Sequence, residues 1–144
     1  MKILLAVDGS ENSLRAAEQA LKLARLNQEV QVTALYVGPS CYDLFPEPGV
    51  CAWIQQKELD KEIETRAAAA LDKVKEIFQP AGVPLQTAVE RGDSGKAICR
   101  LAEEKGFDLV IMGSRGHGDL ANVFLGSVSH KVLHTCRLPV MIVK

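Results

Sequence analysis

The sequence has little charge imbalance and no long apolar run. Its formal net charge is -1 over 144 residues, so no basic field predicts a nucleic-acid or anionic-membrane partner. It contains no run of the about 18 apolar residues that a membrane-spanning helix needs. The opening run, "MKILLAV", is too short for the core of a signal peptide and meets Asp8 and Gly9 instead of a small-residue cleavage site. We therefore expect a cytoplasmic protein.

The four cysteines form no CxxC pair, which argues against a zinc ribbon or a thioredoxin-type motif. They are Cys41, Cys51, Cys99 and Cys136. Cys41 and Cys51 bracket the segment 38–53, "GPSCYDLFPEPGVCAW", which is too broken for a regular element and could lid a site or cover a neighbouring subunit. The two thiols could meet across this loop, but a reducing compartment favours free thiols. We therefore expect free cysteines.

Two short segments contain only part of a known chemical motif. "GDSGK" (92–96) has two residues between its glycines where a phosphate-binding P-loop needs four, so we expect Ser94 to cap a helix instead. His130 and His134 share one helix face, with Cys136 nearby, but zinc needs a third ligand and preferably a fourth. Without an acidic partner, these histidines are expected to be surface residues.

Five short apolar runs alternate with helical patterns along the chain. The runs are 3–7, 30–37, 85–91, 108–112 and 139–143. Unbroken apolar runs are typical of strands buried on both faces of a parallel sheet. Helices are predicted between the runs: after Ser10, along the stripe from Leu59 to Phe78, after Ser94, and from about Val128 to Cys136. The alternation predicts a single α/β domain over 1–144, an open parallel sheet with helices on both faces.

The stretch 112–127, "MGSRGHGDLANVFLGS", places glycines directly after the fourth strand and directly before the last helix. Gly113 and Gly116 allow a sharp turn that aims successive N–H groups into one concavity. Gly126 and Ser127 precede a helix start, where unpaired N–H groups and the helix dipole favour a phosphate. Taken alone, these glycines favour ordinary turns, with Ser127 as a simple helix cap; their position between a buried strand and a helix start shifts the balance toward an anion site.

Two charged residues lie beside these glycines in the predicted topology. Asp8 follows the first strand directly, as Gly113 follows the fourth. In open α/β sheets, ligands lie beyond the carboxyl ends of the strands, where the strand order reverses. Arg115 could add a positive charge for a phosphate. The residues therefore predict an anion site at this edge of the sheet.

The spacing Gly113-x2-Gly116-x9-Gly126-Ser127 resembles the nucleotide-binding pattern of the universal stress protein family. The resemblance extends over the chain, through "ILLAVDGSENS", "DLVIMGSRGHG", "LGSVSHKVL" and "LPVMIVK". It implies a Rossmann-like sheet in the order 3-2-1-4-5, which brings Asp8 next to Gly113. It also implies a homodimer formed through the last strand, 139–143.

In members of the family with this glycine pattern, ATP binds at the same edge of the sheet, and Mg²⁺ could bind through its phosphates. The resemblance implies four contacts at the nucleoside end, with adenine, ribose or an apolar wall: Asp8, Val37, Met112 and Gly113. It implies backbone and hydroxyl contacts at the phosphate end, beside the cation Arg115: Gly116, Gly126, Ser127 and Val128. The implied cofactor is therefore ATP.

Three functions are compatible with this sequence. The first is an ATP-binding regulatory protein of the stress response with little or no hydrolysis, because no Walker-type lysine is present. His117 or Asp119 could serve the γ-phosphate, but nothing in their spacing requires it. The second is a dimeric interaction module without nucleotide, and the third is a slow ATPase or nucleotidyl-transfer enzyme.

Overall fold

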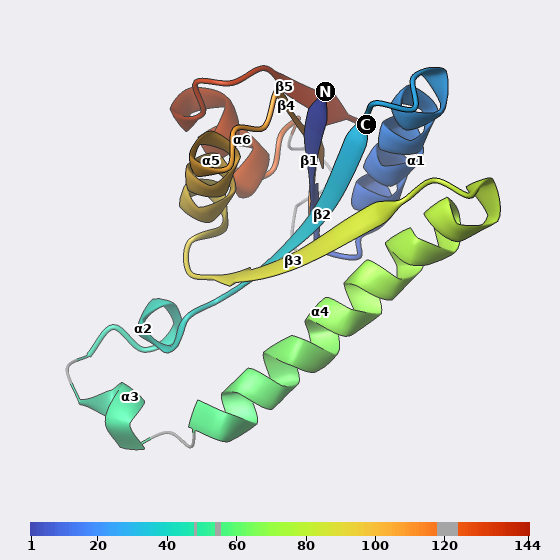
Figure 1. Ribbon diagram of the computed structural model, residues 1–144. Helices are drawn as coiled ribbons and strands as arrows, with labels where there is room; N and C mark the ends of the chain where they lie inside the picture. The colour runs from blue at the N-terminus through green and yellow to red at the C-terminus, as the bar shows by residue number, and fades with distance from the viewer. Residues whose placement is uncertain (48, 54–55, 118–123) are drawn as a thin grey trace.

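The computed structural model (Figure 1) describes residues 1–47, 49–53, 56–117 and 124–144. Its elements, in chain order, are β1 Lys2–Val7, α1 Glu11–Leu26, β2 Gln31–Gly38, α2 Cys41–Leu44, α3 Val50–Trp53, α4 Gln56–Phe78, the 3-10 turn η1 Gln79–Ala81, β3 Leu85–Arg91, α5 Ser94–Glu104, β4 Leu109–Gly113, α6 Ser127–Thr135 and β5 Val140–Val143. The predicted alternation of strands and helices is confirmed.

The five strands form one parallel sheet in the order β3-β2-β1-β4-β5, which confirms the expected topology. β1 is the central strand and pairs with β2 on one side and β4 on the other. Its apolar residues from Ile3 to Val7 are all buried, as expected for a strand covered on both faces. The chain adds β2 and β3 on one side of β1 and then returns to add β4 and β5 on the other side. The strand order therefore reverses between β1 and β4.

Helices cover both faces of the sheet, and each pair encloses its own apolar core. Figure 1 shows α1 and α4 on one face and α5 with α6 on the other. The first core centres on Ile3, Leu5 and Val7 of β1 with alanines of α1 and the buried stripe of α4. The second contains the alternate β1 residues, Leu4 and Ala6, against α5 and α6. The period of two along β1 thus divides its side chains between the cores.

Helix α1 packs closely on the sheet because its inner face consists of small residues. Ser10 caps it, with its hydroxyl oxygen accepting a hydrogen bond from Ser13 N at 3.3 Å. The fully buried positions of α1 include Ala16, Ala17 and Ala20. Leu14 and Leu21 of α1 are partly buried and pack at the edge of the same core.

Two local expectations were wrong, one about the cap of α5 and one about the segment 38–53. Asp93, one residue before Ser94, caps α5 and accepts from Lys96 N at 2.9 Å. The longer carboxylate reaches the third N–H group, so Ser94 becomes the first helical residue. In segment 38–53, α2 and α3 replace the expected irregular loop. Ser40 begins α2 through a capping box with Asp43, and these hydrogen bonds hold the pKa of Asp43 below its usual range.

The expectation of free thiols is also wrong for this structure. Cys41 pairs with Cys51, with Cα atoms 5.8 Å apart, and Cys99 of α5 pairs with Cys136 at the end of α6, with Cα atoms 5.0 Å apart. No cysteine is left free. The second pair forms because α5 and α6 pack side by side, an adjacency that thiol spacing in the sequence does not reveal. Disulfides persist in oxidising surroundings, so the compartment argument does not hold here.

Within the described ranges, no helix combines the length and apolar character needed to cross a bilayer.

The disulfides give the first testable prediction. Protein purified without reductant and denatured should show no titratable thiol with a chromogenic disulfide reagent. Replacing Cys99 and Cys136 by Ser should lower the free energy of unfolding by about 4 kcal/mol in a chain-entropy estimate, because the link closes a long loop. Urea denaturation measures this loss.

The matched control is the Cys41→Ser/Cys51→Ser pair, whose sequence separation is 10 instead of 37. Its shorter loop predicts a smaller loss of stability, about 2.5–3 kcal/mol in the same estimate. Finding four reactive thiols in the denatured wild-type chain would show that the cysteines are unpaired.

Candidate functional site: a cleft at the reversal of strand order

A cleft of about 350 Å³ opens at the carboxyl ends of β1 and β4. Parallel sheets bind ligands at this position because the chain leaves the two strands toward opposite faces. All nine residues singled out in the sequence line this one cleft: Asp8, Val37, Met112, Gly113, Arg115, Gly116, Gly126, Ser127 and Val128. Residues up to 120 positions apart in the chain therefore share one site.

Asp8 lies where the end of β1 meets the glycine loop. Its Oδ1 accepts a hydrogen bond from Ser10 N at 2.9 Å. A Cβ added to Gly116 would lie 2.6 Å from Asp8 Oδ2, so any larger residue would require the Asp8 carboxylate to move. His117 Nε2 lies 2.9 Å from the Asp8 carbonyl oxygen and, since a carbonyl only accepts, must donate to it. The loop after β4 is thus folded back onto β1.

Gly113 is needed for packing between β4 and α1. A Cβ at this position would lie 2.7 Å from the backbone carbon of Asn12, closer than side-chain carbons approach. The sequence pointed to close approach of a ribose, and the structure adds a second reason for the glycine. A larger residue here would push the end of β4 away from the start of α1.

A junction of buried hydrogen bonds joins the end of β4 to the start of α6. Ser114 N donates to Val143 O at 2.7 Å, and Gly126 N donates to Ser114 O at 2.7 Å. The Ser129 hydroxyl lies 2.8 Å from Ser114 O and 3.0 Å from Gly126 O. Ser114 and Ser129 are both buried. This Ser114–Gly126–Ser129 junction places the start of α6 at the cleft.

The start of α6 differs from the starts of α1 and α5. Ser10 and Asp93 cap those two helices with side-chain oxygens. α6 has Gly126 at its N-cap, which offers no side-chain cap. The first N–H groups of an α-helix lack partners within the helix, and here they belong to Ser127 and Val128, which line the cleft. An anion in the cleft could accept these hydrogen bonds and interact favourably with the helix dipole.

Part of the cleft lining is apolar. Val37 of β2 and Met112 of β4 contribute to it, together with Leu35 and Ile98. Leu35, Ile98 and Met112 are buried in the second core, so this wall is held rigidly by packing. A flat apolar group such as a nucleobase could be buried against it.

An ion pair links the two helices on the α5 side of the cleft. Lys131 Nζ lies 2.5 Å from Asp93 Oδ2, and the Lys131 hydrogen bond holds the pKa of Asp93 below its usual range. Gly95 makes room for the Lys131 stem, because a Cβ there would lie 2.8 Å from Lys131 Cδ. Since the folded pKa is lowered, this contribution to stability is present above the ordinary Asp pKa and is lost as the pH falls through the folded value.

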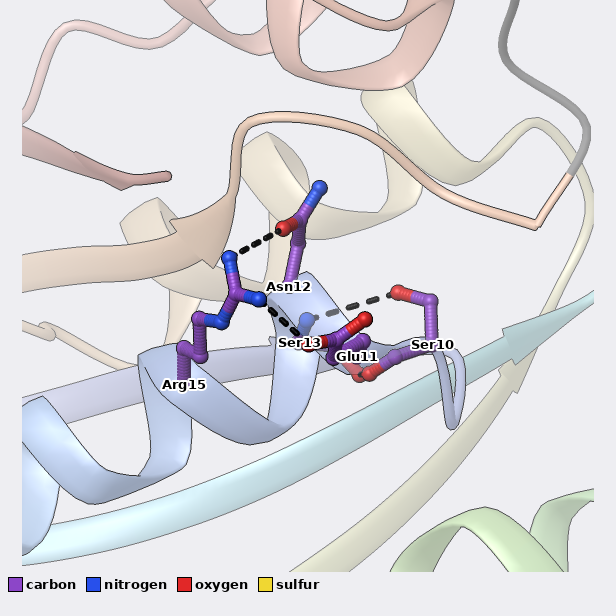
Figure 2. A network of polar contacts seen from close by, with 5 residues as sticks. All are labelled: Ser10, Glu11, Asn12, Ser13 and Arg15. Carbon is purple, nitrogen blue, oxygen red and sulfur yellow. Dashed lines mark hydrogen bonds and ion pairs between the residues drawn. The ribbon is translucent and has the colours of Figure 1, made fainter. Parts of the chain in front are cut away.

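A second, polar recess of about 300 Å³ adjoins the cleft and shares Arg115, Gly116 and His117 with it. Its other lining residues come from the first turns of α1. Figure 2 shows the Arg15 guanidinium between Asn12, at 3.5 Å from its Oδ1, and Glu11, with which it forms an ion pair. The recess therefore contains charges of both signs.

Sequence reasoning missed several lining residues. Ser13, Ser94 and Ser129 line the cleft, yet their spacing had suggested only helix caps or nothing. Ser129 shares a helix turn with Gly126, and that proximity to the glycine pattern is the signal that could have found it. Gly118 and Asp119 lie outside the described residues. Among the described His, Cys, Asp and Glu side chains, no group of three or more could hold a metal ion.

The fold and the cleft define the class of this protein. It is an open parallel α/β protein with a ligand-sized cleft at the reversal of strand order. The sequence profile of the universal stress protein family matches residues 1–144. Universal stress protein YxiE of Bacillus subtilis is 32% identical over 146 aligned positions, which cover 99% of this chain and 98% of YxiE. The chain belongs to the universal stress protein family.

Solved structures show the same fold. The structure of hypothetical protein MJ0577, from Methanocaldococcus jannaschii, superposes with a TM-score of 0.83 and 26% identity, covering 99% of this chain and 94% of that one. A universal stress protein family protein of Arabidopsis thaliana, solved with AMP bound, superposes with a TM-score of 0.71 and 22% identity, covering 100% and 91% of the two chains.

The junction at the start of α6 gives the second prediction. Ser129→Ala should lower the free energy of unfolding by about 1–2 kcal/mol, because two buried carbonyl groups lose their hydroxyl partner. It should also speed hydrogen exchange of the Gly126 amide, which is bonded across the same junction. Urea denaturation and amide exchange by NMR measure the two effects.

Ser13→Ala is the matched control, because the Ser13 hydroxyl is also buried and also donates to a carbonyl, that of Ser10, at 2.9 Å. It should cost similar stability and leave the Gly126 amide unchanged. If Ser129→Ala leaves exchange at Gly126 unchanged as well, Ser129 does not hold this junction.

Proposed function

We propose that this chain binds ATP in the cleft and that the bound nucleotide sets its conformation or its choice of partner in the stress response. The observation that carries the proposal is the convergence of the nine sequence-selected residues on one cleft. The volume, about 350 Å³, lies within the range of small-molecule sites. The AMP bound to the Arabidopsis relative, which has the same fold, supports an adenine nucleotide as the ligand.

The cleft has an apolar wall and a polar end, and this difference sets the proposed orientation of the nucleotide. The apolar wall with Val37 and Met112 suits the adenine, and the Asp8 carboxylate suits ribose hydroxyls or the adenine amino group. The uncapped start of α6, at Ser127 and Val128, suits the phosphates. This orientation places Gly113 at the ribose end and Arg115, Gly116 and Gly126 at the phosphate end.

We propose that the nucleotide is bound with little or no hydrolysis, because the sequence has no Walker-type lysine. Among the described lining residues, Asp8 is the one carboxylate and belongs to the nucleoside end of the proposed orientation, while His117 contacts the Asp8 carbonyl oxygen. Phosphoryl transfer needs a group that orients the attacking water and a cation at the phosphates. Mg²⁺ would enter bound to the phosphates, because the described side chains offer no cluster for it. ATP consumption in a single-turnover assay should not exceed the buffer blank.

One part of the proposal concerns where the protein is located in the cell. We retain a cytoplasmic location as a prediction, although the two disulfides favour oxidising surroundings. Immunodetection after fractionation of the source cells tests it. Exclusive recovery outside the cytoplasmic fraction would refute this part and leave nucleotide binding untouched.

Gly126→Val tests the phosphate end. Gly126 has φ -69° and ψ 164°, a conformation open to β-branched residues, so the chain should still fold. The added side chain blocks close approach of phosphate to the start of α6. Losing two charge-assisted hydrogen bonds should weaken ATP binding by about 100-fold. Isothermal titration calorimetry measures the affinity, and circular dichroism checks the fold.

Ala69→Val is the control, because Ala69 is exposed on α4 and the change creates the same β-branched side chain outside the cleft lining. Ser127→Ala, which removes only a hydroxyl, should weaken binding less than Gly126→Val. Mass spectrometry of small molecules released from freshly purified protein should identify an adenine nucleotide. Finding none, with no measurable ATP affinity afterwards, would favour the nucleotide-free interaction module.

We also propose that two copies pair through 139–143. β5 is an edge strand, bonded to β4 on one side only, and Met141 is 36% exposed on it. Met141→Lys should yield monomers in sedimentation velocity, because a lysine on an edge strand opposes pairing. Val89→Lys, on the opposite edge strand β3 and also exposed, should leave a dimer. A wild-type chain that sediments as a monomer would contradict the proposal.

A further inference from the structure

Two histidines on α6 lie outside the cleft lining and have no part in the proposed nucleotide site. His130 and His134 are both exposed. Their Nε2 atoms lie 3.2 Å apart, and their ring centroids lie 4.4 Å apart with the planes inclined by 62°. Consecutive turns of the helix thus bring two imidazole nitrogens to one point on the surface.

We propose that His130 and His134 chelate one divalent transition-metal ion of the Zn²⁺, Ni²⁺ and Cu²⁺ class. Metal–imidazole bonds are about 2.0–2.1 Å long, so nitrogens 3.2 Å apart subtend an angle of about 100–105° at an ion placed between them. That angle is close to the tetrahedral value. Histidines at i and i+4 are also the spacing with which helices bind zinc in metalloprotease motifs.

Both rings must present a lone pair for chelation. In the present contact, one Nε2 carries a proton and donates it to the other. Moving that proton to Nδ1 of the same ring frees both Nε2 lone pairs without net loss of a proton. A small rotation of the rings then directs the lone pairs to the ion. The metal replaces the shared hydrogen, and the helix backbone does not change.

The rigidity of α6 reduces the ordering cost of binding. His130 N donates to Gly126 O at 2.9 Å, and Cys136 N donates to Val132 O at 2.9 Å, so regular helix extends on both sides of the pair. The Cys99–Cys136 disulfide fixes the end of α6 to α5. Because the four cysteines are paired, no thiol of the chain competes for the ion. The histidine positions are therefore set before the ion arrives.

The site is open, which distinguishes it from a structural zinc site. The described His, Cys, Asp and Glu side chains supply no third ligand here. The site has two protein ligands, one fewer than catalytic zinc sites have, so the remaining positions belong to water or to a donor from outside the chain. Imidazole selects Zn²⁺, Ni²⁺ and Cu²⁺ over Mg²⁺. The ion should therefore bind in the micromolar class or weaker, and Mg²⁺ should not displace it.

The test uses nucleotide-free protein, so that phosphates do not bind the ion, in a non-chelating buffer without reductant. Isothermal titration calorimetry with ZnCl₂ should show one ion per chain, and excess MgCl₂ should not change the affinity. In NMR spectra, Zn²⁺ should shift the imidazole signals of His130 and His134 and leave those of His117 in place. His134→Asn should weaken Zn²⁺ binding by about tenfold or more, the scale on which metal sites respond to lost partners.

A matched variant separates the effect of the spacing between the two histidines from the effect of their number. His134→Asn/Thr135→His keeps two histidines on α6 at exposed positions. They are then five residues apart, a spacing that places them on different faces of the helix. It should bind Zn²⁺ as weakly as His134→Asn alone. Wild-type affinity in this variant, or Zn²⁺-induced shifts confined to His117, would overturn the proposal. Either outcome would leave the proposal of ATP binding in the cleft standing, since the metal titration contains no nucleotide.

Discussion

The reversal of strand order between β1 and β4 is the constraint on which the rest of this structure depends. β1 pairs with both β2 and β4, and the chain leaves the carboxyl ends of β1 and β4 for helices on opposite faces. The two connections therefore diverge and leave a cleft between them. Asp8 lies on one connection and Gly113 to His117 on the other, so the sheet alone decides which residues meet.

Much of this arrangement could be predicted because it depends on patterns that are local in the sequence. Unbroken apolar runs indicated the buried strands, and their bounds shifted by only a residue or so. The glycine pattern at the end of β4 and Asp8 at the end of β1 indicated this edge of the sheet, and the resemblance to the family added residues such as Val37, Met112 and Val128. The convergence of the nine candidate residues on one cleft is a matter of fold, and the binding of ATP there remains a proposal.

The rest could not be predicted, because it depends on which elements lie side by side. The Cys99–Cys136 pair requires α5 and α6 to pack together, and the sequence places these residues 37 apart. Gly113 has a packing role only because the start of α1 lies against it. Ser114 and Ser129 matter because their bonds cross from β4 to α6. The glycine pattern marks the neighbourhood of Gly113 and Ser129, but the partners that these residues contact are visible only in the three-dimensional structure.

Helix α6 combines three features that all depend on its fixed position. Its start is held by the Ser114–Gly126–Ser129 junction and has no side-chain cap, which leaves N–H groups for an anion. Its far end is tied to α5 through Cys136, and its exposed face brings two imidazole nitrogens together. A helix free to shift would lose the position of its first N–H groups relative to the cleft, whereas the spacing of its two histidines is set within the helix itself. The tethering of α6 at both ends therefore matters most for the anion position that we propose at its start.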